Sequence, residues 1–443
     1  MPKAQCWKSV SGGYAHSAGI KEDGTLWTWG DNKYGQLGNG TVLTELYPTQ
    51  VGTETNWAKV SCGGLFVVAM KNDGSIWSWG WNATGELGLG TTTDSITIPT
   101  QIGTSTNWVD VAAGWAHVLA LDGNGSIWSW GYNSFGSLGN GTTTSTNSPA
   151  LLSLVSDWEY IVAGSDHSLG IRGQGLLLSW GRGDVGQLGI GSTPFWMVNP
   201  QEISSDTWFE VNAGNSHCAS LKYAGPQQAT LWTWGQNNKG QLGDGTNTDK
   251  NTPIQIGIGD DWAKLQCNYS STYAIKADGS LWSWGENDGG QLGSSSFDLN
   301  TPAQVGNANI WQDIYSVKGK YMLATKTDGS LWAWGKNDDG QLGNGTTSNS
   351  NIPVLIMSCL LGLEDNGIQN VSIFPNPATD WLQLKGTQDI EIQELYITDI
   401  KGQQVAFAKE NADRINIEHL NAGIYFIHIA TQSSFIQLKF VKI

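Results

Sequence analysis

The chain has 443 residues, including 58 glycines and 24 tryptophans, and only 14% of its residues are charged. An average domain spends about a quarter of its residues on charge and about 7% on glycine, so this composition indicates a folded, turn-dense β protein and excludes a disordered one. The net charge of −16 argues against a nucleic-acid partner, because phosphate recognition depends on clustered lysine and arginine.

The first ten residues lack the apolar core of a secretory signal. If the protein is exported, we therefore expect the printed sequence to have lost its leader or to begin at the wrong methionine. No apolar run approaches the roughly 18 residues of a membrane helix, so we predict no membrane span. The five cysteines form no Cys-x-x-Cys pair, which excludes a zinc ribbon and a thioredoxin-type site.

The element Trp-x-Trp-Gly recurs seven times, with a period of about 51 residues, and its fourth copy has Leu178 in place of the first tryptophan. The second tryptophans are Trp29, Trp79, Trp130, Trp180, Trp234, Trp284 and Trp334. A second ladder of tryptophans keeps the same period: Trp7, Trp57, Trp108, Trp158, Trp208, Trp262 and Trp311. The chain therefore contains seven copies of one structural repeat.

Short strands joined by tight turns fill each repeat. In the first repeat, residues 17–21 and 25–29 flank Asp23-Gly24, which is a strong hairpin signal. Three or four such strands cannot bury their faces alone and must stack on their neighbours. Radial stacking into a closed seven-bladed β-propeller achieves this, whereas the rungs of a β-helix are much shorter than 50 residues.

The motif Gly-x-x-His-Ser, followed by Asp-Gly-x-Leu-Trp-x-Trp-Gly and Gly-Gln-Leu-Gly-x-Gly, runs from Gly13 to Gly40. It resembles the repeat of the regulator of chromosome condensation family, which also occurs in bacterial β-lactamase inhibitor proteins. A variant of Gln-Leu-Gly returns in every repeat, and the resemblance covers Trp7 to Ile356. It implies a seven-bladed propeller that serves as a binding platform.

Beyond Met357 the tryptophan period stops, and we predict a linker over 359–370 between a propeller domain (1–358) and a second domain (371–443). Short alternating segments separated by turn residues predict a small β-sandwich there. The expected strands are 371–374, 381–385, 392–398, 414–417, 424–430 and 435–441.

This second domain resembles the C-terminal sorting domain of the type IX secretion system of Bacteroidota. The matching residues include Phe374, Pro375, Asn376, Pro377, Gly402, Gly423, Tyr425 and Lys442. The resemblance implies contact with the secretion machinery and export to the outer cell surface or the medium.

Four histidines share one repeat register, His16, His117, His167 and His217. The same register holds Phe66, Ser271 and Tyr321 in the other repeats, which favours a packing role over a metal site. No Gly-x-Ser-x-Gly elbow, P-loop or His-Glu-x-x-His is present. We therefore predict no metal, no cofactor and no enzymatic activity.

Positions that differ between repeats are the best candidates for binding, because the scaffold does not dictate them. Aromatic residues and arginine gather in the turns of repeats one to four, and such residues anchor interfaces. The predicted binding residues are Tyr14, Tyr34, Trp81, Trp115, Tyr132, Phe135 and Arg182. An alternative is that some of these rings only cover neighbouring blades.

Cys6 and Cys359 flank the ring at its two ends. Continuing the repeat past its seventh copy would place the next ladder tryptophan at position 362, which coincides with Trp7 in a closed ring. We therefore predict a disulfide between Cys6 and Cys359 in an oxidising compartment.

These features together predict a secreted or surface-displayed monomer that binds another protein through its propeller. An alternative is a carbohydrate-binding protein in which Trp81, Trp115 and Tyr132 stack on sugar rings. A third hypothesis is a hydrolase with its site in the central channel. The sequence does not identify the protein or glycan partner.

Overall fold

The computed structural model describes residues 6–93, 95–153, 155–225, 228–294, 297–358, 372–385, 392–399, 404–408, 414–431 and 435–443. The chain divides into two compact units, Met1–Cys359 and Leu360–Ile443. Neither unit, over its described residues, contains a helix with the length and apolarity needed to cross a membrane. The predicted linker 359–370 lies outside the described residues.

Each repeat of the first unit forms one antiparallel four-stranded sheet, in the order of the sequence. The first strands are β1 (Trp7–Gly12), β5 (Trp57–Cys62), β9 (Trp108–Ala113), β13 (Trp158–Ala163), β17 (Trp208–Ala213), β21 (Trp262–Asn268) and β25 (Trp311–Ile314). The second strands are β2 (His16–Lys21), β6 (Phe66–Lys71), β10 (His117–Asp122), β14 (His167–Arg172), β18 (His217–Gly225), β22 (Ser271–Lys276) and β26 (Tyr321–Lys326).

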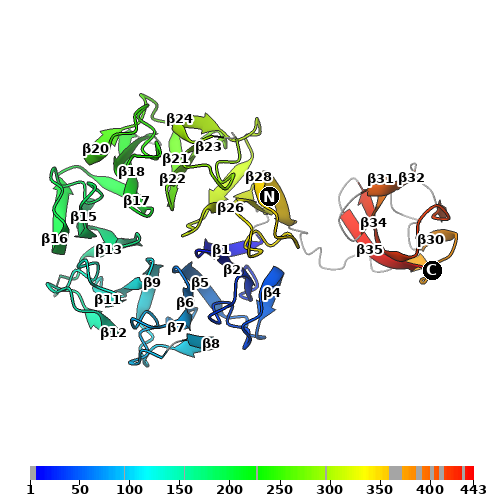
Figure 1. Ribbon diagram of the computed structural model, residues 1–443, viewed down its shortest axis with the longest axis horizontal. Helices are drawn as coiled ribbons and strands as arrows, with labels where there is room; N and C mark the ends of the chain where they lie inside the picture. The colour runs from blue at the N-terminus through cyan, green and yellow to red at the C-terminus, as the bar shows by residue number, and fades with distance from the viewer. Residues whose placement is uncertain are drawn as a thin grey trace. The chain divides into compact units, whose positions relative to one another are not determined.

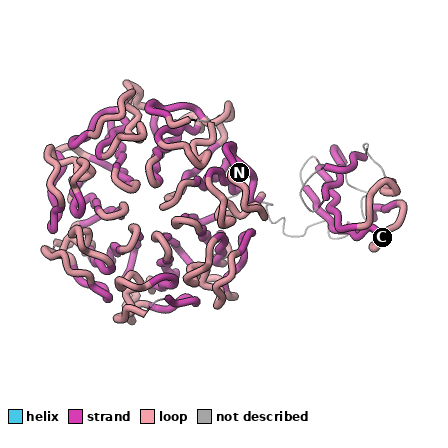
Figure 2. The backbone as a smooth tube through the Cα atoms, in the orientation of Figure 1, coloured by secondary structure: helices cyan, strands magenta, loops and turns pink. Residues whose placement is uncertain are grey.

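The third strands are β3 (Leu26–Gly30), β7 (Ile76–Trp81), β11 (Ile127–Gly131), β15 (Leu176–Arg182), β19 (Gln228–Gly235), β23 (Leu281–Gly285) and β27 (Leu331–Gly335). The fourth strands are β4 (Glu45–Val51), β8 (Ser95–Gln101), β12 (Thr146–Leu151), β16 (Trp196–Ser204), β20 (Lys250–Gln255), β24 (Leu299–Gln304) and β28 (Ser350–Met357). The sheets radiate from a central axis, with the first strands inside and the fourth strands outside (Figures 1 and 2). The seven-bladed propeller is confirmed.

A hydrogen bond between neighbouring blades explains why the elements of the repeat keep a fixed spacing, and we call this bond, with the glycine packed against it, the latch. The second tryptophan of Trp-x-Trp-Gly is fully buried in all seven repeats, and in six of them it donates its indole N–H to the preceding blade, at the carbonyl just before Leu-Gly. Trp79 donates to the Gln36 carbonyl at 2.9 Å, and Trp130 donates to the Glu86 carbonyl at 2.9 Å. The glycine of this Leu-Gly pair is also needed for the contact. A Cβ on Gly38, which has a φ of 69°, would lie 2.7 Å from the Trp79 indole nitrogen.

The same latch closes the ring. Trp29 of the first blade donates its indole N–H to the Gln341 carbonyl of the seventh blade at 2.9 Å. The Gly12 amide also donates to the Ser316 carbonyl at 2.8 Å. The first blade contains strands β1 to β4 and the seventh blade contains strands β25 to β28. Neither blade therefore borrows a strand from the other end of the chain when the ring closes.

The latch can be tested with a matched pair of tryptophans. Trp130 and Trp284 are both fully buried, but only Trp130 has a partner for its indole N–H. Because Trp130→Phe leaves the buried Glu86 carbonyl without its donor, it should lower the free energy of unfolding by about 1–3 kcal/mol more than Trp284→Phe. Denaturant unfolding of both variants measures the difference, and equal losses would show that the latch contributes nothing beyond packing.

The second compact unit contains two sheets. One consists of β29 (Ser372–Phe374), β30 (Trp381–Lys385) and β33 (Arg414–Asn416). The other consists of β31 (Ile392–Asp399), β32 (Gln404–Ala408), β34 (Gly423–Thr431) and β35 (Phe435–Lys442). Leu382 and Ile415 of the first sheet share one buried cluster with Ile397, Ile427 and Phe440 of the second, as expected for a small sandwich. The strand β32 was not expected from the sequence.

The residues of the sorting motif meet at one edge of this unit. Asn376 accepts a hydrogen bond from the Val441 amide at 3.0 Å, and the adjacent Ala378 pairs with Lys442. Lys442 also pairs with Gly423 across β34 and β35, while Tyr425 stacks on Phe440 at 5.6 Å between ring centroids. The remaining motif residues Phe374, Pro375 and Pro377 flank Asn376, and Gly402 lies outside the described residues.

Candidate binding face

One end of every blade carries the turn between its first and second strands together with the segment that follows its third strand. A backbone hydrogen bond joins the two parts: the amides of Trp81, Tyr132 and Arg182 donate to carbonyls directly before the histidine register. This arrangement places all seven predicted binding residues at the same end of the propeller. We call this end the aromatic face, defined by Tyr14, Tyr34, Trp81, Trp115, Tyr132, Phe135 and Arg182.

The structure brings these residues into three groups. Tyr34 lies edge-on to Trp81, with 4.5 Å between ring centroids. Tyr132 lies 6.3 Å from Phe135. The third group joins Tyr14 of the first blade to Trp115 of the third blade at 5.5 Å.

The Tyr14–Trp115 contact passes over the second blade. Gly64 occupies the equivalent turn position there, and a Cβ at Gly64 would lie 3.1 Å from the Trp115 indole. The Tyr14 amide donates to the Gly64 carbonyl at 3.0 Å, and the Gly64 amide donates to the Trp115 carbonyl at 2.9 Å. These bonds form part of a rim around the mouth of the central channel.

Two further aromatic residues extend the Tyr132–Phe135 group. Phe195 lies 6.0 Å from Phe135 and 4.9 Å from Trp196, and the exposed fractions of Phe195 and Trp196 are 55% and 45%. Sequence reasoning missed both residues. Their signal was a Pro-Phe-Trp run in the loop of the fourth repeat, where the third repeat has only threonine, serine and asparagine.

Arg182 connects the aromatic group to two carboxylates. Its guanidinium carbon lies 5.0 Å from the Phe135 ring centroid, and its Nε and Nη2 donate to both Asp184 oxygens at 2.9 and 2.8 Å. The hydrogen bond with Asp184 raises the pKa of Arg182. Burial raises the pKa of Asp166, whose carboxylate lies 3.7 Å from the same guanidinium. The carboxylates of Asp184 and Asp166 therefore hold the Arg182 guanidinium against the Phe135 ring.

The opposite side of the same face is charged rather than aromatic. Lys320 pairs with Asp288 at 2.7 Å and with the buried Glu286 at 3.2 Å. Burial and the neighbouring carboxylates Asp31 and Asp338 raise the pKa of Asp339. Blades one to four therefore carry the aromatic residues of this face, and blades six and seven carry an acid-rich surface that extends to Asp31 of blade one.

A cavity of about 190 Å³ lies inside the propeller and is lined by residues of all seven blades. Lys318 reaches across it and donates from Nζ to the Ala163 carbonyl at 2.7 Å. Burial lowers the pKa of Lys318 to about 8. Outside the cavity lining, burial raises the pKa of Glu210 in β17 to about 7. The other cavity cation, Lys59, pairs with Asp110.

The histidine register forms contacts between blades. His117 Nε2 lies 2.9 Å from Ser168 Oγ, and His217 Nε2 lies 2.9 Å from Thr272 Oγ1. A Ser–His contact also occurs in nucleophilic sites, but here the Ser168 hydroxyl donates to the Ser137 carbonyl at 2.8 Å. The hydroxyl therefore accepts from His117, and both side chains are closed to solvent.

These contacts give the histidines a structural role. Burial lowers the pKa of His117, His167 and His217 to about 3, so their rings are neutral at physiological pH. His167 Nε2 makes the equivalent contact with Cys218 Sγ at 3.2 Å. Among the residues that the structure describes, no group of three or more His, Cys, Asp or Glu side chains is placed to hold a metal ion.

Comparisons with family models cover nearly the whole chain. A model of the RCC1-like domain matches residues 54–373, and models of the regulator of chromosome condensation repeat match residues 7–36 and 23–70. A model of the secretion system C-terminal sorting domain matches residues 372–443. Among curated proteins, the ultraviolet-B receptor UVR8 of Arabidopsis thaliana is 28% identical over 137 residues. The match spans 30% of this chain and 31% of the receptor.

Solved structures share the propeller fold. Human WBSCR16 superposes with a TM-score of 0.67 at 21% identity, over 75% of this chain and 94% of that one. Yeast RCC1, solved bound to Kap60, gives a TM-score of 0.67 at 19% identity, over 79% of this chain and 85% of that one. At these identities the likeness concerns the fold.

Proposed function

The chain belongs to the RCC1-like domain family, and we propose that its exported propeller binds a partner protein through the aromatic face. The sorting domain marks the chain for export by the type IX system to the cell surface or the extracellular space. The propeller fold provides a rigid platform, and the residues that vary between blades provide the specificity.

The observation that carries this proposal is the group around Arg182. Phe135, Phe195 and Trp196 form a continuous series of ring contacts, and Arg182 lies against Phe135 with its charge balanced by Asp184. Exposed aromatic residues beside an anchored arginine are typical of the energetic centre of a protein interface.

The orientation of the rings favours a protein over a glycan. Tyr34 and Trp81 meet at an interplanar angle of 70°, and Tyr132 and Phe135 meet at 67°. Each ring therefore turns part of its face or edge toward its neighbour instead of presenting a flat stacking platform. The central cavity gives no comparable support to a hydrolase, because its lysines are engaged with Ala163 and Asp110.

The test compares capture by the full chain with capture by the triple variant Trp81→Ala, Tyr132→Ala, Arg182→Ala. We expect the wild type to retain a surface protein that the triple variant loses by at least tenfold, since both aromatic anchors and the arginine are removed. Tyr223→Ala is the matched control, because Tyr223 is a 61% exposed aromatic residue at the other end of its blade. Surface extract and a glycan array are the two sources of ligand.

Each outcome has a defined meaning. Equal capture by the wild type and the triple variant would contradict the assignment of this face. Capture from the glycan array but not from the extract would replace the protein partner by a carbohydrate. Near-ultraviolet circular dichroism verifies that the triple variant is still folded.

A further inference from the structure

At the end of the blades opposite the aromatic face, a cation lies over the ladder tryptophans in six of the seven repeats. This cation is the residue of the second strand that pairs with the ladder tryptophan of the first strand, as Lys21 pairs with Trp7. The cation-to-ring-centroid distances are 5.7 Å for Lys21 and Trp7, 4.8 Å for Lys71 and Trp57, 5.7 Å for Arg172 and Trp158, 5.8 Å for Lys222 and Trp208, 4.9 Å for Lys276 and Trp262, and 5.0 Å for Lys326 and Trp311.

The third repeat replaces this cation by a carboxylate. Asp122 occupies the register position opposite Trp108, where the other repeats have lysine or arginine. Trp108 and Trp128 keep the usual edge-on arrangement, with 5.8 Å between centroids and an interplanar angle of 82°. The third repeat therefore presents the same pair of rings with a negative charge beside them and no cation of its own at this position.

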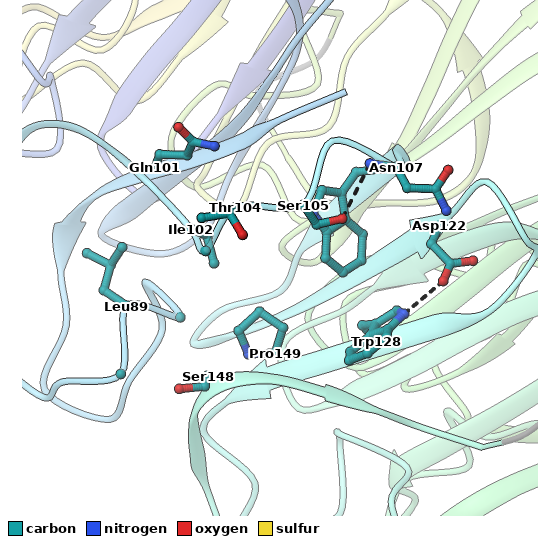
Figure 3. Close-up of a pocket in the computed structure, with 14 residues that line it drawn as sticks. Leu89, Gln101, Ile102, Thr104, Ser105, Asn107, Asp122, Trp128, Ser148 and Pro149 are labelled. Atoms are coloured by element: carbon teal, nitrogen blue, oxygen red, sulfur yellow. Dashed lines mark hydrogen bonds between the residues drawn. The ribbon is translucent and has the colours of Figure 1, made fainter. Parts of the chain in front are cut away.

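The carboxylate is held in place by its own turn. Asp122 Oδ2 accepts the Trp128 indole N–H at 3.0 Å, and Oδ1 accepts the amides of Asn124 and Ser126 at 2.9 and 3.0 Å. Figure 3 shows the Asp122–Trp128 pair, with Asn107 and Pro149 close by. The negative charge is thus fixed next to the aromatic rings rather than free to turn away.

A cavity of about 420 Å³ opens at this place and is lined by both tryptophans, Asp122, Ile102, Asn107 and Pro149. The sixth repeat has an equivalent cavity of about 420 Å³, lined by Trp262 and Pro302, and there Lys276 is one of the walls. The two cavities share their scaffold and their size, and they differ in charge at two positions: Lys276 replaces Asp122, and Asp244 replaces Leu89.

We propose that the third-repeat cavity binds the side chain of a lysine from a partner protein. The ammonium group would lie over the Trp108–Trp128 pair and near Asp122, as the internal lysines do over the equivalent rings, and Ile102 and Pro149 would contact its methylene groups. A cation is attracted by the negative face of an indole ring, and a nearby carboxylate adds to that attraction. The site is separate from the aromatic face and does not depend on its function.

The test uses the full chain and the probe Nα-acetyl-lysine N-methylamide. Saturation-transfer nuclear magnetic resonance should detect binding to the wild type, and the uncharged norleucine analogue should bind at least tenfold more weakly. The double variant Asp122→Lys, Asn124→Asp gives the third repeat the residues that the first repeat has at the equivalent positions, Lys21 and Asp23. It should therefore stay folded and no longer bind the lysine probe. The triple variant of the aromatic face should bind the probe as the wild type does.

Three results would overturn the proposal. Equal binding of the lysine and norleucine probes would show an apolar groove without cation recognition. Binding that persists in the double variant would place the probe elsewhere on the chain. Binding of tetramethylammonium without binding of the lysine probe would assign the cavity to a free quaternary ammonium ligand. Tryptophan fluorescence verifies the fold of the double variant. A second variant, Trp128→Leu, keeps Asp122 and should bind the lysine probe at least tenfold more weakly than the wild type.

Discussion

At pH 5 the propeller is expected to be several kcal/mol less stable than at pH 7. Burial lowers the pKa of His117, His167 and His217 to about 3 and that of His16 to about 4, whereas an exposed histidine titrates near 6.5. Below pH 6.5 the unfolded chain therefore binds protons that the folded chain does not, and stability falls as the pH falls. Each of these histidines contributes about 2 kcal/mol to the loss between pH 7 and pH 5.

Glu210 acts in the opposite direction over the same range. Because burial raises its pKa to about 7, the folded chain takes up this proton before the unfolded chain does, and the protonated form gains stability as the pH falls toward 4.5. One such group offsets only part of the loss from four histidines. Lys318, with its pKa lowered to about 8, is protonated in both states below pH 7 and leaves the balance unchanged.

Denaturant unfolding at pH 7 and pH 5, followed by tryptophan fluorescence, measures the effect on the propeller, since Trp381 is the only tryptophan beyond residue 358. His117→Phe copies Phe66, which occupies the same register in the second repeat, and it should reduce the pH-dependent loss by about 2 kcal/mol. His419→Asn, in the second compact unit, should leave the loss in the propeller unchanged. An identical pH dependence in the wild type and His117→Phe would show that the register does not remain neutral.

The fold could be predicted because its determinants recur at a fixed period. Trp79 and Gly38 belong to the latch between two neighbouring blades, and each has an equivalent in other repeats, so the motif records a contact that every blade must make. The position of the histidines in the interior could also be predicted, because Phe66 and Tyr321 replace them in the same register. Repetition turns a tertiary contact into a sequence pattern.

The contacts that are not repeated could not be predicted. Tyr14 reaches Trp115 only because Gly64 has no side chain between them, and this follows from the curvature of the ring rather than from local sequence. The strand β32 lies in the second unit, where no repeat marks the elements. Asp122 was visible as an exception in the sequence, but its significance depends on the tryptophans that the sheet places beside it.

Removing the predicted disulfide by Cys6→Ser and Cys359→Ser is expected to lower the free energy of unfolding by about 3–6 kcal/mol, because a closed loop of roughly 350 residues restricts the unfolded chain strongly. Cys6 is disulfide-bonded, and Cys62, Cys218 and Cys267 are free and buried. Cys359 lies outside the described residues, so its pairing with Cys6 stays a prediction. Thiol titration in denaturant should find three thiols before reduction and five after it, and five thiols before reduction would exclude the bond.

Cys218→Ser is the matched control for this experiment. Ser168 occupies the equivalent position and donates to the equivalent carbonyl, so the substitution should reduce the titration from three thiols to two without a comparable loss of stability. If the control destabilised the propeller as much as the double variant does, the loss would reflect core packing rather than the cross-link.

A bond between the chain ends has a particular value in this propeller because no strand is exchanged between the first and last blades. Strands β1 to β4 and β25 to β28 each form a complete sheet, so among the described residues the two blades meet through side-chain and backbone contacts such as Trp29 with Gln341 and Gly12 with Ser316. The bond of Trp29 with Gln341 has equivalents between other blades, but neighbouring blades elsewhere are also joined by the continuing chain, which is a covalent connection that the first and last blades do not share. An oxidising exterior would allow Cys6 to supply that connection, and reduction should then open the ring at this joint first.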